Sequence, residues 1–155
     1  MVRKLWISGS VLFVSALAFT LGVASAASDI TGPVTISVIE HPSHDKIIDI
    51  GAKGDSPGDM FMFHNQLFDE TDTTLVGTDS GMCIREAPNQ GIWECWWTIT
   101  LAQGQITAEG PFSDTAVTDV FAVTGGTGIY ENVRGSSVET LTAAGTYVLT
   151  YNLIP

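Results

Sequence analysis

The chain has 155 residues, and its 17 acidic and six basic side chains give a formal net charge of −11 at pH 7. Nucleic acids and anionic membrane surfaces repel a protein with this charge, so the composition excludes both as partners. The length suits a single domain.

The first 26 residues have the features of a signal peptide. Arg3 and Lys4 precede a mostly apolar stretch over residues 5–23, and Ala24-Ser25-Ala26 supplies the small residues of a cleavage site. A membrane anchor is the alternative, but Ser, Thr and Gly residues interrupt the stretch, and an anchor needs about 20 apolar residues. We therefore expect a signal peptide over 1–26 and a domain over 27–155. The protein would be secreted, or periplasmic if the source is Gram-negative, and no membrane contact would follow cleavage.

The rest of the chain is a series of short β-rich runs broken by Gly, Pro, Asp and Asn, without helical periodicity. Strands are predicted over 34–41, 59–69, 74–86, 92–101, 105–112, 119–124, 133–141 and 145–153, with a short extra piece over 46–50. Eight strands suit a closed antiparallel barrel, which has no exposed sheet edges and whose interior holds side chains or one small ligand. The fold class is therefore all-β, a single eight-stranded antiparallel barrel. A two-sheet sandwich is the alternative.

Two cysteines in an exported chain favour a disulfide. If residues 74–86 and 92–101 form a hairpin with a turn over 88–91, positions that sum to 178 lie opposite one another. Cys83 then faces Cys95, close enough for a bond. Because side chains alternate between the faces of a strand, the odd-numbered residues of the second strand share the more apolar face. These residues, expected in the core, are Trp93, Cys95, Trp97, Ile99 and Leu101.

A glycine-rich segment over 120–128, with the sequence VFAVTGGTG, looks like a dinucleotide-binding turn. That site requires a helix whose N-terminus receives the pyrophosphate inside a parallel sheet. Only 27 residues follow, and they show no amphipathic helix, so we interpret the segment as a tight connection between two barrel strands. We expect no cofactor. His41, His44 and His64 are the only histidines, and we expect no metal site.

The same segment, extended to residues 121–130 with the sequence FAVTGGTGIY, resembles part of a known protein family. It is similar to a segment shared by allene oxide cyclases and plant dirigent proteins, a superfamily of eight-stranded barrels. Other similar segments follow in the right order: GDMFMFHNQLFD over 58–69, LVG over 75–77, GMC over 81–83 and ITAEGPF over 106–112. The resemblance covers residues 58–155 and is that of a secreted bacterial member of the allene oxide cyclase barrel-like group.

The resemblance implies a lumen that binds a small hydrophobic molecule, which in the cyclases is an unsaturated fatty-acid epoxide. The matching cavity positions, with Trp97 added from the inward face of the hairpin, are Phe61, Phe63, Asn65, Cys83, Trp97 and Phe112. Glu40 matches the glutamate that opens the epoxide in the cyclases. Arg134, followed by Gly135, matches an arginine of the dirigent cavity. Pro42 stands where the cyclases have an Asn that helps to hold a water.

Two hypotheses for the function follow. In the first, the lumen binds or stereochemically guides a small hydrophobic molecule, with isomerase-, cyclase- or dirigent-like activity and with Glu40 and Arg134 as catalytic groups. In the second, the chain is a non-enzymatic carrier or a structural barrel with a filled core. The volume of the lumen separates the two. By resemblance, the protein would be a homodimer or a homotrimer.

Overall fold

The computed structural model describes residues 29–155, and the expected signal peptide lies outside this range. The described chain is nearly all strand, with two short 3-10 helices. The strands are β1 (Val34–His41), β2 (Lys46–Ile48), β3 (Met60–Phe68), β4 (Leu75–Ala87), β5 (Ile92–Leu101), β6 (Gly104–Ser113), β7 (Thr118–Gly126), β8 (Arg134–Leu141) and β9 (Tyr147–Ile154). The helices are η1 (Pro88–Gln90) and η2 (Gly128–Tyr130). Each predicted strand is present, with ends that differ by a few residues.

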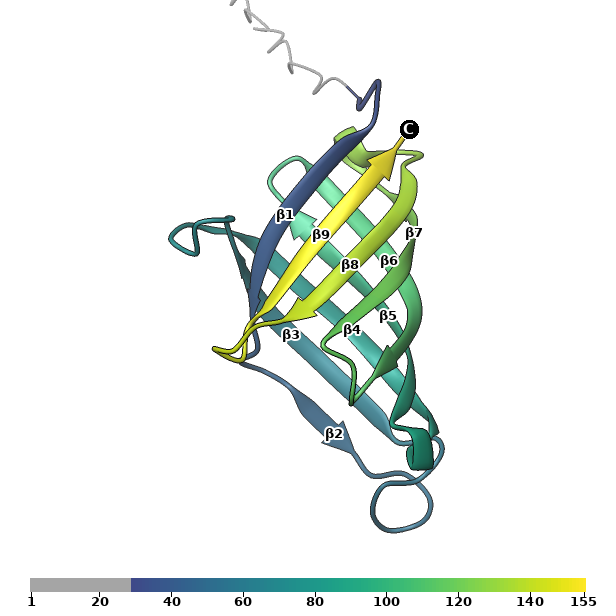
Figure 1. Ribbon diagram of the computed structural model, residues 1–155. Helices are drawn as coiled ribbons and strands as arrows, with labels where there is room; N and C mark the ends of the chain where they lie inside the picture. Colours follow the sequence, from purple (N-terminus) through teal and green to yellow (C-terminus); the bar gives the residue numbers. More distant parts are fainter. Residues whose placement is uncertain (1–28) are drawn as a thin grey trace, which may run out of the picture.

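Eight antiparallel strands form a closed barrel (Figure 1). Each strand from β3 to β8 pairs with the next along the chain, β1 pairs with β9, and β1 also pairs with β3, which closes the circle. The ninth strand, β2, pairs only with β3 and lies outside the closed ring. The all-β barrel is thus confirmed, and the sandwich alternative is wrong because the first and last strands of the chain pair directly.

The central hairpin has the predicted register. Cys83 lies opposite Cys95 in β4 and β5, and the two form a disulfide. The odd-numbered residues of β5 face inward, since Trp93, Trp97 and Ile99 are buried while Trp96 on the other face is exposed. Leu101, at the end of the strand, is only half-buried.

The glycine-rich segment is a structural connection, as predicted. It ends β7, forms η2 and leads into β8. Gly128 has a φ of 64°, and a Cβ there would lie 2.2 Å from the backbone oxygen of Gln103. Only glycine fits that approach. The segment therefore packs against the β5–β6 turn and does not begin a phosphate-binding helix.

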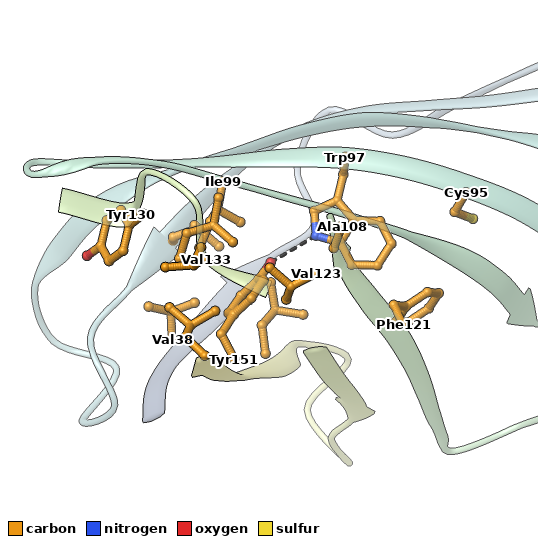
Figure 2. Close-up of a cluster of buried hydrophobic side chains, with 14 of the residues drawn as sticks. Val38, Cys95, Trp97, Ile99, Ala108, Phe121, Val123, Tyr130, Val133 and Tyr151 are labelled. Carbon is orange, nitrogen blue, oxygen red and sulfur yellow. Dashed lines mark hydrogen bonds between the residues drawn. The ribbon is translucent and has the colours of Figure 1, made fainter. Parts of the chain in front are cut away.

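One half of the lumen is filled. The packed half lies at the end where β1 begins and β9 ends (Figure 1). The fully buried side chains there include Leu67, Ile99, Ile106, Tyr151 and Leu153. Figure 2 shows the boundary of this packing, where the Trp97 indole Nε1 donates a hydrogen bond of 2.9 Å to the Tyr151 hydroxyl. A side chain from β5 and one from β9 thus meet across the lumen.

Within residues 29–155, no helix is long and apolar enough to span a membrane.

Candidate functional site

The other half of the lumen is a cavity. It lies where β1 and β8 end and β3 and β9 begin. Its volume is about 50 Å³, and the space counted out through the open mouth is about 480 Å³. Strands β1, β3–β9 and the connection that follows β1 all contribute to the wall. The lining residues are Glu40, Pro42, Asp45, Phe61, Phe63, Asn65, Asp79, Cys83, Cys95, Trp97, Phe112, Phe121, Glu139 and Tyr147.

Aromatic rings and the disulfide form the apolar part of the wall. The rings of Phe61 and Phe63 lie 5.5 Å apart, and Trp97 meets Phe121 edge-to-face at 4.4 Å (Figure 2 shows the second pair). Gly81 lies opposite both Phe63 and Trp97 in the sheet. A Cβ at this glycine would come within 2.5 Å of each of these two side chains. The missing side chain thus provides the room in which the two rings sit.

The polar part of the wall is organised by Asn65, which is 2% exposed. Its side-chain nitrogen donates to Glu40 Oε1 at 2.7 Å and to Asp45 Oδ1 at 2.8 Å. Its side-chain oxygen accepts from the backbone nitrogens of Ser43 and His44. Asn65 therefore holds the connection after β1 beside the cavity and at the same time orients the Glu40 carboxyl group.

Three carboxyl groups of the wall have raised pKa values. Burial raises the pKa of Glu40 to about 7, against the opposing effect of the Asn65 hydrogen bond, and the Asp45 carboxylate adds to the rise. Burial, with the charges of Glu40 and Asp119, raises the pKa of Glu139 to about 8. Burial and the charges of Glu40 and Glu139 hold the pKa of Asp79 well above its usual range. The cavity therefore retains protons at neutral pH, where an exposed carboxyl group would have lost them.

A cluster of side chains that we call the latch lies at the end of β4 and the start of β5. It consists of Arg85, Trp93, Asp55 and Asp114. The Arg85 guanidinium donates to Asp55 at 2.7 Å and to Asp114 at 2.6 Å, and it stacks 4.0 Å from the centre of the Trp93 ring. Trp93 also donates to Asp114 and lies against Phe61 at 6.2 Å. The latch joins the β2–β3 and β6–β7 loops to strands β4 and β5.

The structure brings most of the sequence-predicted site residues together. All six expected cavity positions line one cavity: Phe61, Phe63, Asn65, Cys83, Trp97 and Phe112. Glu40 lies on the same wall and is 5% exposed. The expectation that Arg134 lines the lumen is wrong. Its neighbours Gly135 and Ser137 share the inward alternation of β8 with Glu139, so Arg134 itself points outward and is exposed.

Sequence reasoning missed Asp45, Asp79 and Glu139. A signal for Asp79 was present, because it shares the odd-numbered face of β4 with Cys83, which the hairpin register had placed inward. Glu139 gave no such signal, because no motif set the phase of β8. Asp45 lies in an irregular connection, whose side-chain directions follow no period.

The comparison with protein families gives one match: residues 40–149 match the family described as "Allene oxide cyclase barrel like domain". No curated protein matches the chain.

Several solved structures share the fold. Pyocyanin demethylase is similar with a TM-score of 0.70 and 29% sequence identity, over 77% of this chain and 99% of that one. An exo-specific intermolecular Diels-Alderase has a TM-score of 0.64 and 14% identity, over 78% of this chain and 97% of that one. A pterocarpan synthase dirigent protein has the same TM-score and identity, over 78% of this chain and 82% of that one. At 14% identity, the last two show a shared barrel fold alone.

Proposed function

The chain belongs to the allene oxide cyclase barrel-like family, and from its cavity we infer that it binds a small, flat, largely apolar molecule in the lumen and transfers a proton to or from it through Glu40. The observation that carries this proposal is a buried carboxyl group, oriented by Asn65, on the wall of a cavity lined by aromatic rings. Flat ligands match aromatic walls, which stack on them and exclude water.

Glu40 suits general acid–base catalysis. Its pKa of about 7 means that the protonated and ionised forms are both populated near neutral pH, the condition under which a carboxyl group transfers protons most efficiently. The hydrogen bond from Asn65 fixes the orientation of the Glu40 carboxyl group at the cavity wall. The wall would also confine the ligand to one conformer, which contributes to rate and to stereochemical outcome. A cyclase-, isomerase- or dirigent-like reaction can use the proton transfer, the confinement of the ligand, or both.

The likeness to pyocyanin demethylase supports chemistry on a small molecule in such a lumen. Because that protein is similar over nearly its whole length, pyocyanin is the first candidate ligand to test against this chain. The packed half of the lumen favours a second candidate function, that of a carrier or a structural barrel without catalysis. A test of the site must therefore separate binding, proton transfer and packing.

Phe63→Trp tests whether the cavity is a binding site. The larger ring should fill the space, so methylnaphthalene, and pyocyanin if it is a ligand, should bind about tenfold more weakly while the melting temperature changes little. If the space is a packed core instead, the same change should cost roughly 1–3 kcal/mol of stability. Calorimetric titration and thermal unfolding measure both quantities. Phe68→Trp, on the same strand but outside the cavity, is the matched control. Unchanged binding with a large loss of stability would overturn the cavity function.

Proton transfer is tested with 2-tetralone, a flat bicyclic ketone with acidic C–H groups. In deuterated water the protein should accelerate exchange of these hydrogens, and Glu40→Gln should slow that exchange by about tenfold or more. NMR follows the loss of proton signal. Glu109→Gln, an exposed residue on the outside of β6, is the control. Binding of 2-tetralone without accelerated exchange would support the carrier function.

Export is also part of the proposal. We propose that a signal peptide is removed after Ala26, so that the mature protein begins at Ala27 and is secreted, or periplasmic in a Gram-negative source. N-terminal sequencing of protein from the medium or the periplasm measures this directly. Protein that starts upstream of Leu21, or full-length protein in the membrane fraction, would contradict it. The homodimer or homotrimer stays a prediction.

A further inference from the structure

One buried oxygen at the cavity lacks a partner. Asp79 is 2% exposed and lines the cavity, and its Oδ1 atom makes no hydrogen bond within residues 29–155. A buried carboxyl oxygen without a partner costs free energy, so such atoms in folded proteins usually have a donor in the functional state. Because Asp79 lines the cavity, a molecule bound there could supply this donor.

The charges around the cavity have one sign. Four carboxyl groups line it: Glu40, Asp45, Asp79 and Glu139. The lining contains no Lys, Arg or His. The Arg85 guanidinium is paired with Asp55 and Asp114 in the latch. A cavity with this lining favours a ligand that brings positive charge.

The carboxyl groups come from three strands and from the connection after β1. In the described part of the chain, no three His, Cys, Asp or Glu side chains are placed so that they could share one metal ion. Aromatic rings line the same cavity, among them those of Phe61, Phe63, Trp97 and Phe121. Rings attract cations through their faces. Carboxyl groups together with aromatic faces fit an organic cation.

We propose that the lumen is selective for an organic cation: a flat aromatic ligand with one positive charge or one N–H donor, which Asp79 Oδ1 receives and which Glu40 and Glu139 face. This inference rests on the proposed function, because it names the class of ligand for the same cavity. It goes beyond that function because it requires a positive charge or an N–H donor on the ligand.

Binding of a cation should release a proton from the acids of the cavity. Near neutral pH the acids of the cavity hold protons, since burial and mutual repulsion raise the pKa values of Glu40, Asp79 and Glu139. A bound positive charge replaces a proton as the compensating charge, so the affinity for a cation should rise with pH across the range from about 6 to 8. The other titratable groups that face these acids are Asp45, Asp119, Tyr147 and Tyr151. They are acids too, so they act in the same direction.

The experiment compares two probes of nearly the same shape, the N-methylquinolinium cation and neutral methylnaphthalene. Calorimetric titration of the full exported protein is carried out at physiological salt, which screens attraction to the outer surface. At about pH 8 the cation should bind at least about tenfold more tightly than the neutral probe. At about pH 5.5 the preference should largely disappear, because Glu40, Asp79 and Glu139 are then protonated.

Two variants locate the effect. Asp79→Asn keeps the size of the side chain but removes its charge, and it should reduce the ratio of the cation affinity to the neutral-probe affinity by about tenfold. Glu139→Gln should act in the same direction, so the test does not depend on the folding of one variant. Glu109→Gln removes one charge from the exposed outer face and should change neither affinity.

The outcomes separate the two proposals. A preference for the cation that needs Asp79 and Glu139 supports selectivity for organic cations. Equal binding of both probes, or tighter binding of the neutral one, overturns this inference but leaves the proposed function intact. A preference that survives both lumen variants and is lost in Glu109→Gln would place the cation on the outer surface and also overturn it. If neither probe binds, the lumen takes no such ligand and the proposed function fails as well.

Discussion

Glu40→Gln should make the barrel more stable at about pH 8, by up to about 3 kcal/mol in the free energy of unfolding, and should leave it nearly unchanged at about pH 4. In the folded protein the pKa of Glu40 is raised from 4.5 to about 7, chiefly by burial. The glutamine has the same shape, and its side-chain oxygen can still accept the hydrogen bond from Asn65. The variant therefore removes a buried charge without removing a contact.

The sign of this stability change follows from the protonation of Glu40 in the folded and unfolded states. Between about pH 4.5 and 7 the folded protein keeps the Glu40 proton while the unfolded chain has lost it, so the stability of the wild type falls as the pH rises through this range. Glu139, with a raised pKa of about 8, extends the fall toward higher pH. Below about pH 4 both states are protonated and the difference disappears.

Denaturant unfolding at several pH values measures this effect for the wild type, for Glu40→Gln and for Glu109→Gln. The last variant removes an exposed carboxyl group and should follow the wild-type curve. If Glu40→Gln were less stable than the wild type at pH 8 by as much as at pH 4, the ionised form of Glu40 would be compensated in the folded state. The acid–base role proposed for it would then lose its basis.

Arg85→Ala should lower the free energy of unfolding by about 3 kcal/mol. The Arg85 side chain is 8% exposed, forms ion pairs with Asp55 and Asp114, and stacks on Trp93. Both carboxylates are themselves half-exposed and can be rehydrated when the arginine is removed. The loss should therefore be smaller than the sum of the separate contacts.

Two further variants make this prediction specific. Arg85→Lys keeps the charge but cannot reach both carboxylates with a planar group, so its loss should lie between those of the wild type and Arg85→Ala. Arg134→Ala removes an exposed arginine from the same barrel and should change the stability by no more than about 0.5 kcal/mol. Denaturant midpoints compare the three. Equal stability of Arg85→Ala and Arg134→Ala would show that the latch does not stabilise the barrel.

The strands and the hairpin register could be predicted from the sequence because they depend on local information. Turn residues end each strand, and the alternation of side chains then assigns each residue to one of two faces. The Cys83–Cys95 pair adds a distance constraint, and the alternation then predicts that Trp93 and Trp97 face inward, where the structure has them buried. The six cavity positions followed from the same alternation together with the family resemblance.

The electrostatics of the cavity could not be predicted in this way, because they depend on residues that are distant in the sequence. Glu40, Asp79 and Glu139 lie on three different strands, and only barrel closure brings them to one wall. Their raised pKa values come from shared burial and mutual repulsion, which no local pattern records. Arg134 is a second example of this limit. It matched a cavity motif of the resembling family, but the alternation of side chains in β8 directs it to solvent. The sequence by itself determined which segments are strands and which faces are apolar. Which acids meet in the lumen was decided only by the way the strands close on one another, since charges interact through space and not along the chain.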